Sequence, residues 1–526
     1  MMPSVLEEWP WAYVLLDSET MQYCHYCFRR CDDLLECSVC EFAVYCNTKC
    51  QKNAWPDHSG ECFLIARTPY DLPTTIVRLI SRVLIKINMQ GLKSDILMTT
   101  TLTDYKKPNF EELDSHYKEI NEDASKTTNF TQCMHQLHMF MDAERLPASA
   151  RLLDIYGKIA FNSLLILNND LNPIGLGVYL TFSQFQHSCI PNSAVIFNGP
   201  TAILNYLGST PPEKRDAATS YTISYGPIME ETEMRRRYLY NNYYFVCQCP
   251  RCSDENFDLI ASSLSCKTEN CPGHVAFRQS NDVPPAPGSS SSDSTELHAA
   301  VGTCDVCGKG AENIWESKIL MITSNQENDN FADEDSRMSN ILSRHCLILL
   351  TLKKTTLTLI RSLTFRCLRM EERFKTIGEL YKKQMRHLHP LNVYLIRTKC
   401  ILASACQSRG LVTDALAQYE QLLPVFRYYL PANHPTLALM ELNAGNLQWK
   451  QKNWDAAKQH FVEAMNIMKF SHGRNHPLSK TVKQCVAACD AAKKGKRLNK
   501  VPPAVQAIQK PKEQVKSGPA VQVKKP

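Results

Sequence analysis

Residues 24–62 read CHYCFRRCDDLLECSVCEFAVYCNTKCQKNAWPDHSGEC, and the spacing of their cysteines decides how this part of the chain folds. The stretch contains two Cys-x2-Cys pairs, a Cys-x3-Cys pair and a His-x3-Cys pair. A Cys-x2-Cys turn directs both thiolates at one ion, and side chains four residues apart share a helix face, so each pair can supply two zinc ligands. The order of the pairs predicts two cross-braced zinc sites, formed by Cys24, Cys27, Cys46 and Cys50 and by Cys37, Cys40, His58 and Cys62.

So short a segment buries too little surface to fold by itself, so we expect metal binding to supply most of its stability. Cys31 falls outside the four pairs and is expected to be structural.

A second group of cysteines provides three thiolates, one fewer than a closed tetrahedral zinc site needs. These are Cys247, Cys249 and Cys252, and the missing ligand is predicted to be Cys189 in the stretch FQHSCIPN. The alternative is that Cys189 is a packed, inert thiol. A third group has CPG and CGKG turns that suit zinc-ribbon knuckles, and it predicts a fourth zinc site formed by Cys266, Cys271, Cys304 and Cys307.

The bulk composition narrows the class of protein. The chain has 526 residues, a net charge of +6 and 23 cysteines. We recognise no signal peptide and no uninterrupted apolar run of membrane-spanning length, so a reducing compartment is expected. In such a compartment cysteines favour metal binding over disulfides. The positive charge is not gathered on one face as in a dedicated nucleic-acid-binding protein.

The pattern of the chain changes several times along its length. It is mostly helical over 63–150, rich in short β-type runs over 174–225, and helical again from about 340 to 493. The Ser/Pro-rich stretch 281–296 predicts a flexible insertion, and the acidic stretch 325–335 predicts a solvated loop.

The C-terminal helical region contains a repeat. His-Pro pairs recur at 389–390, 434–435 and 476–477, and each is expected to open a helix with proline in its first turn. The stretches TDALAQYEQLL and WDAAKQHFVEAM are equivalent second helices. Such helix pairs are typical of tetratricopeptide (TPR)-like units. The alternative is an unrelated helical bundle.

Taken together, these motifs resemble the SET- and MYND-domain (SMYD) family of protein-lysine methyltransferases. Residues 24–62 resemble a MYND zinc finger, FQHSCIPNSAVIFNG followed by YTISYG resembles the core of a SET domain, and CQCPRC resembles the post-SET cysteines. The resemblance implies an α+β fold, in which a β-rich SET domain is split by a zinc-bound MYND finger and followed by an all-α TPR-like helical-repeat domain.

The family order divides the chain into eight segments. They are a truncated N-terminal SET part (1–23), the MYND finger (24–62), a helical SET insertion (63–150), the core SET domain (151–246), a Cys-rich post-SET region with the fourth zinc site (247–310), an acidic linker (311–340), the TPR-like domain (341–493) and a basic disordered tail (494–526).

The resemblance also implies that S-adenosyl-L-methionine (AdoMet) is the methyl donor. The implied catalytic residue is Tyr225, the implied substrate channel contains Tyr243 and Phe245, and the implied cofactor-binding residues are Asn162, Gln186, His187, Tyr225 and Phe245. Methyl transfer needs a neutral lysine amine, whose pKa in water is about 10.4, so an aromatic channel that desolvates and aligns the amine suits the reaction. Without the flanking motifs, the same aromatic residues would be read as the core of a strand-rich domain.

The chain departs from the family pattern in three places. The Gly-rich strand pair that begins family members has no counterpart before VLEEWPWAYVLLDSE, which predicts weak AdoMet binding and an exposed sheet edge, in either a shortened gene product or an inactive protein. Gln186 stands where the family has asparagine. RDAATSYTISY replaces the acidic turn that precedes the catalytic tyrosine strand.

Two functions are therefore expected as alternatives. The first is an AdoMet-dependent protein-lysine N-methyltransferase, acting on a histone or non-histone lysine as a monomer in the nucleus and cytoplasm, where it would regulate chromatin. The second is a weakly active or inactive scaffold whose finger binds proline-rich peptides and whose helical repeats bind extended segments. No membrane association is expected, and direct DNA binding is disfavoured because the finger has mixed charge and lacks an exposed recognition helix.

Overall fold

The computed structural model describes residues 4–68, 72–90, 98–102, 108–209, 220–276, 302–310 and 356–495. The expected insertion at 281–296, the linker at 311–340 and the tail beyond residue 495 lie outside the described residues. None of the helices in these ranges is long and apolar enough to span a membrane.

One antiparallel sheet joins strands from distant parts of the chain in the order β5-β1-β10-β9. The strands are β1 (Leu6–Glu8), β5 (Met98–Thr100), β9 (Ser193–Asn198) and β10 (Thr201–Tyr206). The turn between β9 and β10 contains Gly199 at φ +60°, where a Cβ would lie 2.5 Å from the carbonyl oxygen of Cys27. Only glycine allows this hairpin to approach the cysteine-rich segment so closely.

A second antiparallel sheet has the order β2-β7-β6, with β2 (Ala12–Leu15), β6 (Ser163–Leu167) and β7 (Pro173–Val178). All four residues of β2 are buried, so this short strand is a core element despite lying at the end of the sheet. A separate parallel pair joins β8 (Gln186–His187) to β11 (Thr222–Ile223). The parallel pair aligns two motifs that are far apart in sequence.

The outer edge of β2 is covered by a helix. Three basic side chains of α2 (Thr75–Gln90) donate to alternate carbonyl oxygens of this segment: Arg78 to Leu15 at 2.6 Å, Arg82 to Tyr13 at 2.5 Å and Lys86 to Trp11 at 2.6 Å. Helix residues four apart lie on the same face of α2, and the carbonyl oxygens of every second residue in an extended strand point to the same side. Three successive turns of α2 can therefore each bind one carbonyl along this edge. The N-terminal strands β1 and β2 were expected to leave a sheet edge exposed, and this expectation is wrong. In the first sheet β5 pairs with β1, and in the second sheet α2 covers the free edge of β2.

The cysteine-rich segment consists of a small hairpin and a helix, namely β3 (Leu35–Glu36), β4 (Val44–Tyr45) and α1 (Thr48–Arg67). Asn47 caps α1 by accepting the backbone N–H of Cys50 at 2.9 Å. Helices α4 (Ala124–Phe140) and α5 (Ser149–Asn162) pack against α2, α3 (Tyr117–Glu122) packs against α4 and α5, and α5 runs directly into β6. Short 3-10 helices lie at η1 (Phe110–Glu112), η2 (Ala143–Arg145) and η3 (Phe182–Gln184).

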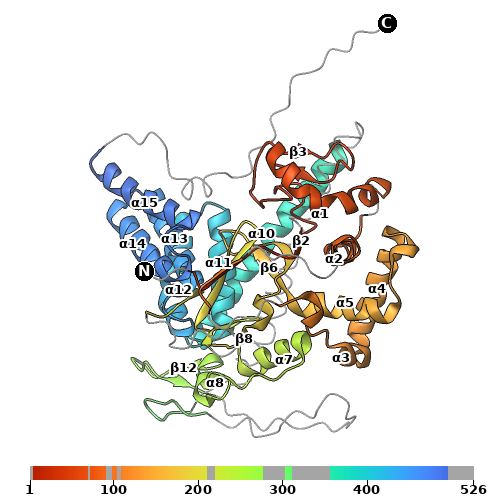
Figure 1. The fold of residues 1–526 in the computed structure, drawn as a ribbon. Helices are drawn as coiled ribbons and strands as arrows, with labels where there is room; N and C mark the ends of the chain where they lie inside the picture. Colours follow the sequence, from red (N-terminus) through yellow and green to blue (C-terminus); the bar gives the residue numbers. More distant parts are fainter. Residues whose placement is uncertain are drawn as a thin grey trace.

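Two short helices and a hairpin follow the sheets. They are α7 (Thr232–Tyr243), α8 (Glu255–Ala261), β12 (Leu264–Ser265) and β13 (His274–Val275). The remaining described chain is helical: α10 (Thr356–His387), α11 (Val393–Ser408), α12 (Val412–Tyr429), α13 (Pro435–Lys450), α14 (Trp454–Ser471) and α15 (Pro477–Lys493). Figure 1 shows α12–α15 on one side of the strands and α2–α5 on the other.

Two of the three His-Pro pairs begin a helix as expected, and the first pair does not. At α13 and α15, His434 and His476 are the N-caps and proline occupies the first turn, as expected. At α11 the N-cap is Asn392, whose side chain accepts the N–H of Tyr394 at 3.0 Å, so Pro390 precedes the helix and that expectation is wrong. Asparagine is a strong N-cap, so the helix starts beside it and not at the proline.

The two halves of the molecule are joined by buried hydrogen bonds. Asn205 on β10 donates to the carbonyl of Ser471, and a ring nitrogen of His476 lies 3.1 Å from the carbonyl oxygen of Phe197 on β9. An α+β N-terminal region with Cys/His clusters and an all-helical packed C-terminal region together confirm the predicted fold class.

Candidate active site and metal centres

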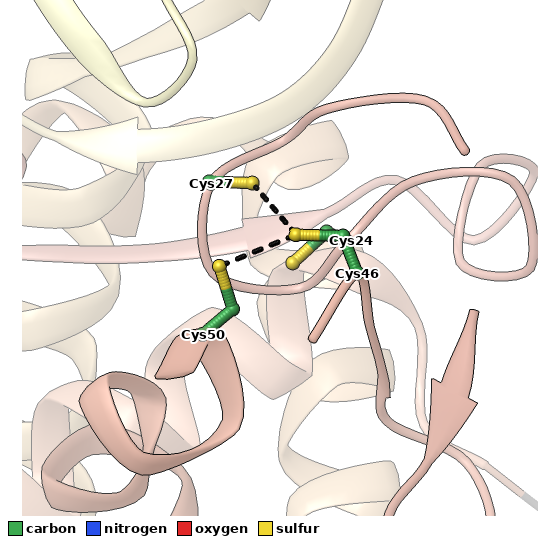
Figure 2. Close-up of side chains that lie close together, drawn as sticks. All are labelled: Cys24, Cys27, Cys46 and Cys50. Carbon is green, nitrogen blue, oxygen red and sulfur yellow. Dashed lines mark hydrogen bonds between the residues drawn. The ribbon is translucent and has the colours of Figure 1, made fainter. Parts of the chain in front are cut away.

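The first predicted set of zinc ligands converges at the start of α1. Figure 2 shows Cys24, Cys27, Cys46 and Cys50 pointing their sulfurs toward one another. The sulfur of Cys46 lies 3.7 Å from that of Cys27 and 3.4 Å from that of Cys50. A tetrahedral ion with Zn–S bonds of about 2.3 Å holds its sulfurs about 3.8 Å apart, whereas a disulfide would bring two of them to about 2.05 Å. The spacing fits a metal and not a disulfide.

The second set, Cys37, Cys40, His58 and Cys62, is buried throughout. Sulfur to sulfur, Cys37 and Cys62 lie 3.7 Å apart, and His58 Nε2 lies 3.5 Å from the sulfur of Cys40. The other ring nitrogen of the histidine faces Glu61 Oε1 at 3.3 Å. This carboxylate–histidine arrangement is the kind that fixes the ring of a zinc-binding histidine.

Arg82 donates hydrogen bonds to both carboxylate oxygens of Glu61. Its Nε donates to Oε2 at 2.8 Å and its Nη2 donates to Oε1 at 2.5 Å. Burial opposes ionisation of Glu61, but the charge and hydrogen bonds of Arg82, together with His58, outweigh burial and lower the pKa of the carboxyl below its ordinary value. Because Arg82 also caps Tyr13 on β2, one guanidinium connects the second cluster to the three-stranded sheet.

The third set joins the remote Cys189 to the three cysteines that follow α7. Cys189, Cys247, Cys249 and Cys252 form one cluster, and the sulfur of Cys189 lies 3.6 Å from that of Cys252. Arg235 of α7 is buried and places Nη2 3.5 Å from the sulfur of Cys252. A buried cation beside four thiolates offsets part of their negative charge.

The fourth set, Cys266, Cys271, Cys304 and Cys307, also converges. Its sulfurs lie 3.6 Å apart for Cys266 and Cys307 and 3.7 Å apart for Cys271 and Cys304. Cys31, outside the predicted pairs, belongs to none of the four clusters.

His187 connects the third cluster to the predicted catalytic tyrosine. Its Nδ1 accepts the backbone N–H of Tyr225 at 3.0 Å, and its Nε2 lies 3.2 Å from the sulfur of Cys189. Burial, reinforced by Arg235, lowers the pKa of His187 to about 4, so the ring is neutral at physiological pH. With Nδ1 accepting, Nε2 carries the hydrogen and faces the thiol.

The Tyr225 side chain lies in an aromatic group beside this histidine. Its ring centroid is 5.0 Å from that of Tyr243, 5.3 Å from that of His187 and 6.2 Å from that of Phe245. The phenol donates to the carbonyl of Phe185, at the residue before β8. Burial raises the pKa of Tyr225 to about 12, so the hydroxyl remains protonated.

Asn192, the last residue of the FQHSCIPN stretch, holds the start of β11 (Thr222–Ile223), the strand that ends two residues before Tyr225. Its Oδ1 accepts the N–H of Thr222 at 2.8 Å, its Nδ2 donates to the carbonyl of Ser220 at 2.8 Å, and its own N–H donates to the Thr222 hydroxyl at 3.2 Å. Sequence reasoning gave this asparagine no role. The sequence signal was present, since asparagine after proline commonly hydrogen-bonds to nearby backbone.

The structure places Asn162 and Gln186 apart from this hydrogen-bonded group. Asn162 ends α5 and donates to the carbonyls of Asp114 and Lys158, both at 2.9 Å, while Gln186 is exposed on β8. No side-chain hydrogen bond joins either residue to Tyr225 or His187 within the described ranges. Their assignment to the cofactor site remains a prediction.

Phe161, the residue before Asn162, belongs to an aromatic trio that sequence reasoning missed. The ring of His116 lies 4.6 Å from that of Phe161 and 5.6 Å from that of Tyr244, and Phe161 and Tyr244 are 5.4 Å apart. His116 has a φ of 48°, in the left-handed region that few side chains adopt. Such strained residues gather at ligand sites more often than elsewhere.

The chain is similar in sequence to several known proteins. Residues 24–62 match the MYND finger family. The mouse (Mus musculus) "Histone-lysine N-methyltransferase SMYD3" is 25% identical over 487 residues, which cover 92% of this chain and 91% of that protein. The Arabidopsis thaliana "Histone-lysine N-methyltransferase ASHR1" is 25% identical, covering 90% of this chain and 88% of that protein. The cattle (Bos taurus) "N-lysine methyltransferase SMYD2" is 23% identical, covering 90% of each.

These similarities extend far beyond the finger, across both the strand-rich and the helical parts of the molecule. The chain is homologous to the SET- and MYND-domain (SMYD) lysine methyltransferases over about nine-tenths of its length.

Proposed function

We propose that this protein is an AdoMet-dependent protein-lysine N-methyltransferase. The observation that carries the proposal is the placement of Tyr225, whose phenol is held on the Phe185 carbonyl among His187, Tyr243 and Phe245. The homology to lysine methyltransferases supports the same reaction class. A histone or non-histone lysine side chain is the proposed substrate.

The chemistry of the neighbouring residues fits AdoMet. Aromatic rings at His187 and Phe245, 5.9 Å apart, offer flat apolar surface to a purine. Asn162 uses its amide nitrogen within the fold, and no described residue donates to its Oδ1, which leaves an acceptor for the polar groups of a nucleoside or amino acid. Both ring nitrogens of His187 are engaged by Tyr225 and Cys189, so His187 would contact the cofactor through its ring face or its backbone.

When bound, AdoMet supplies a sulfonium-linked methyl group for displacement by an amine. Tyr225 and Tyr243 would desolvate the lysine side chain and so favour its neutral, nucleophilic form. The Tyr225 hydroxyl donates to the Phe185 carbonyl, so its oxygen lone pairs remain available to orient the amine. The third cluster, through His187, holds the tyrosine in place. The chain thus aligns and desolvates the amine, and no side chain of this group needs to be ionised.

We further propose that each of the four clusters holds a zinc ion. Each offers four Cys or His ligand atoms within 4.8 Å of one another, which is the donor set of a closed structural site. Closed sites leave no open position for a substrate, so their contribution to function is to fix the surrounding chain. The third cluster is the one that bears directly on the proposed active site.

A second candidate function is a scaffold that binds proline-rich peptides through the finger. The observation that favours it is exposed apolar surface on α1, where Trp55 and Phe63 are 44% and 60% exposed. Aromatic rings exposed beside a zinc site are suited to contact proline-rich segments. This function can coexist with methyl transfer.

Methyl transfer can be tested with the full-length, zinc-loaded chain. AdoMet with a labelled methyl group, core histones and a mixture of lysine-containing peptides are incubated with the protein, and methyl-lysine is measured by mass spectrometry. The expected result is methyl-lysine with the parent chain and none with Tyr225→Phe, at equal zinc content. Equal methylation by the Tyr225→Phe variant would contradict the role given to the phenol.

A further inference from the structure

We propose that the cluster of Cys266, Cys271, Cys304 and Cys307 is a structural zinc site that fixes the first hairpin of the helical region, α10–α11, to the segment that follows the proposed active site. This site lies outside the MYND match at 24–62. It also stands independently of the proposed methyl transfer, because its geometry and its contacts involve other residues.

The sulfur geometry is that of a metal site. The two measured sulfur–sulfur distances of 3.6 and 3.7 Å agree with the edges of a tetrahedral Zn–S₄ unit, about 3.8 Å. They are far too long for a disulfide, at about 2.05 Å. Four thiolates without an open position indicate a structural ion.

The backbone around each cysteine pair is folded as a metal knuckle. Cys266 donates its N–H to the carbonyl of Gly273 at 3.1 Å, and its sulfur faces the N–H of Thr268 at 3.4 Å. On the other side, Cys304 donates to the carbonyl of Lys309 at 2.8 Å. The Thr268 N–H can stabilise the Cys266 thiolate, as outer partners of metal ligands do elsewhere, while the two bonds to carbonyls close the turns.

Gly273 is a further sign of a crowded centre. A Cβ at this position would lie 2.4 Å from the sulfur of Cys304 and 2.7 Å from Asp305 Oδ1. Any larger residue would push one knuckle away from the other. The sequence therefore keeps the space next to the sulfurs clear.

The knuckles are attached to the turn between α10 and α11. Leu264 on β12 forms a β-bridge with Leu388, and the Ser265 hydroxyl donates to the Leu388 carbonyl at 3.0 Å. The carbonyl of Ser263 accepts the N–H of His389 at 3.1 Å. Backbone and side-chain hydrogen bonds thus attach β12 to the turn between α10 and α11.

A buried asparagine completes the attachment. Asn392 is fully buried, and its Nδ2 donates to the carbonyl of Ser263 at 3.0 Å while its Oδ1 caps α11 through Tyr394. The phenol of Tyr394 then donates to Glu231, the N-cap of α7, at 3.2 Å. This bond connects α11 to the start of α7. Because α7 ends at Tyr243, it connects α11 to the helix that carries one residue of the proposed substrate channel.

The apolar core at this junction is small. It consists of Leu264, Val275, Cys304, Leu388 and Leu395, each no more than 3% exposed. Cys304 is both a member of this core and a predicted metal ligand, and its bridge to Val275 joins the two knuckles. So small a core contributes little stability of its own, and the ion would add a cross-link to it.

The far end of the helical region has attachments of its own. Asn205 binds the carbonyl of Ser471, and His476 faces the carbonyl of Phe197. Loss of the fourth ion should therefore loosen the turn between α10 and α11 from β12, while α11 keeps its packing against α12 and α13–α15 stay docked.

The experiment combines native mass spectrometry of the full chain with amide hydrogen exchange. The parent should carry four zinc ions, and Cys271→Ser/Cys304→Ser should carry three. Exchange should rise at least tenfold over 377–400 in the variant and stay unchanged over 435–490. Cys133→Ser, whose thiol lies outside all four clusters, is the matched control and should keep four ions and the parental exchange. Cys307→Ser, at an exposed ligand, provides a variant that perturbs the core least.

Three zinc ions in the parent would overturn the site. Four ions in both the double variant and Cys307→Ser would do the same. Loss of one ion without faster exchange over 377–400 would overturn the role in fixing the hairpin. If the double variant fails to fold, the ion count of the parent and the exchange pattern of Cys307→Ser decide the proposal.

Discussion

The backbone N–H of Tyr225 donates to Nδ1 of His187 at 3.0 Å. The same imidazole places Nε2 3.2 Å from the sulfur of Cys189, a member of the third cluster. One neutral ring therefore joins a predicted metal ligand to the strand end that carries the predicted catalytic phenol. This relationship explains why histidine and cysteine stand two residues apart in FQHSCIPN.

The first prediction concerns this ring. His187→Asn should lower kcat for methyl transfer by about 100-fold, because a displacement of the tyrosine by about 1 Å is enough for such a loss. KM for the peptide should change much less. Steady-state kinetics, with zinc content measured in parallel, provide the check. His135→Asn, on the exposed face of α4, should leave both parameters unchanged. Equal kcat values for the two variants would refute the positioning role.

The second prediction concerns the asparagine that holds β11. Asn192→Ala removes the acceptor for Thr222 N–H and the donor to the Ser220 carbonyl, so we expect kcat to fall about tenfold or more. Hydrogen exchange should rise over 220–225. Asn198→Ala, at the exposed end of β9, is the control for loss of a surface amide. Unchanged exchange over 220–225 in the Asn192 variant would contradict the account.

The third prediction concerns the guanidinium that joins the second cluster to β2. Arg82→Met leaves the buried Glu61 carboxylate and the Tyr13 carbonyl without their partner, so we expect a loss of about 3–5 kcal/mol in the free energy of unfolding. Zinc affinity at this cluster should fall about 10–100-fold, because Glu61 orients His58. Denaturant unfolding and competition with a chromogenic chelator measure the two effects.

The control for Arg82 is an arginine in an exposed pair. Arg67 donates to Asp142 at 3.0 Å, and both side chains are about half exposed. Arg67→Met should cost no more than about 1 kcal/mol and should leave zinc affinity unchanged. The prediction fails if the two variants lose similar amounts of stability.

The fourth prediction is a pH dependence that comes from Glu8. This side chain is fully buried on β1, and burial outweighs its hydrogen bonds from the Thr181 N–H, which raises its pKa from 4.5 to about 7. Between these two values the folded chain retains a proton that the unfolded chain has released. The folded state is therefore favoured by this proton below pH 4.5, and that advantage is lost as the pH rises through 7.

Glu8→Gln keeps the shape and an acceptor without a charge. Relative to the parent, its free energy of unfolding should rise as the pH increases from 5 to 8, by up to about 3 kcal/mol. Taking the difference between variant and parent at each pH removes the contribution of the metal-binding thiols, which both chains share. Glu7→Gln, on the exposed face of the same strand, serves as the control. A flat difference for Glu8→Gln across this range would contradict a raised pKa.

The features that follow from local spacing could be predicted from the sequence. Pairs such as Cys24 and Cys27, or His58 and Cys62, can meet one ion because a single turn or helix sets their separation, and the structure groups them with the expected partners. The alternation of β-type runs and the helical repeat likewise follow from periodicity. The N-caps His434 and His476 fall where the His-Pro pairs placed them.

Other features depend on contacts between distant segments. Arg78, Arg82 and Lys86 look like the charged face of a surface helix, and nothing local shows that they cap β2. The parallel pairing of β8 with β11, which brings His187 to Tyr225, also requires the tertiary fold. At the first repeat, Asn392 is engaged by Ser263 from another part of the chain, so the helix starts later than its His-Pro pair predicts.

The central claim is that this chain binds AdoMet at the site around Tyr225 and His187. Isothermal titration of AdoMet into the full-length, zinc-loaded protein tests it most directly. The account predicts saturable binding of one AdoMet per chain, weakened at least tenfold in Asn162→Ala. The absence of any binding to protein that carries its zinc ions would contradict the account.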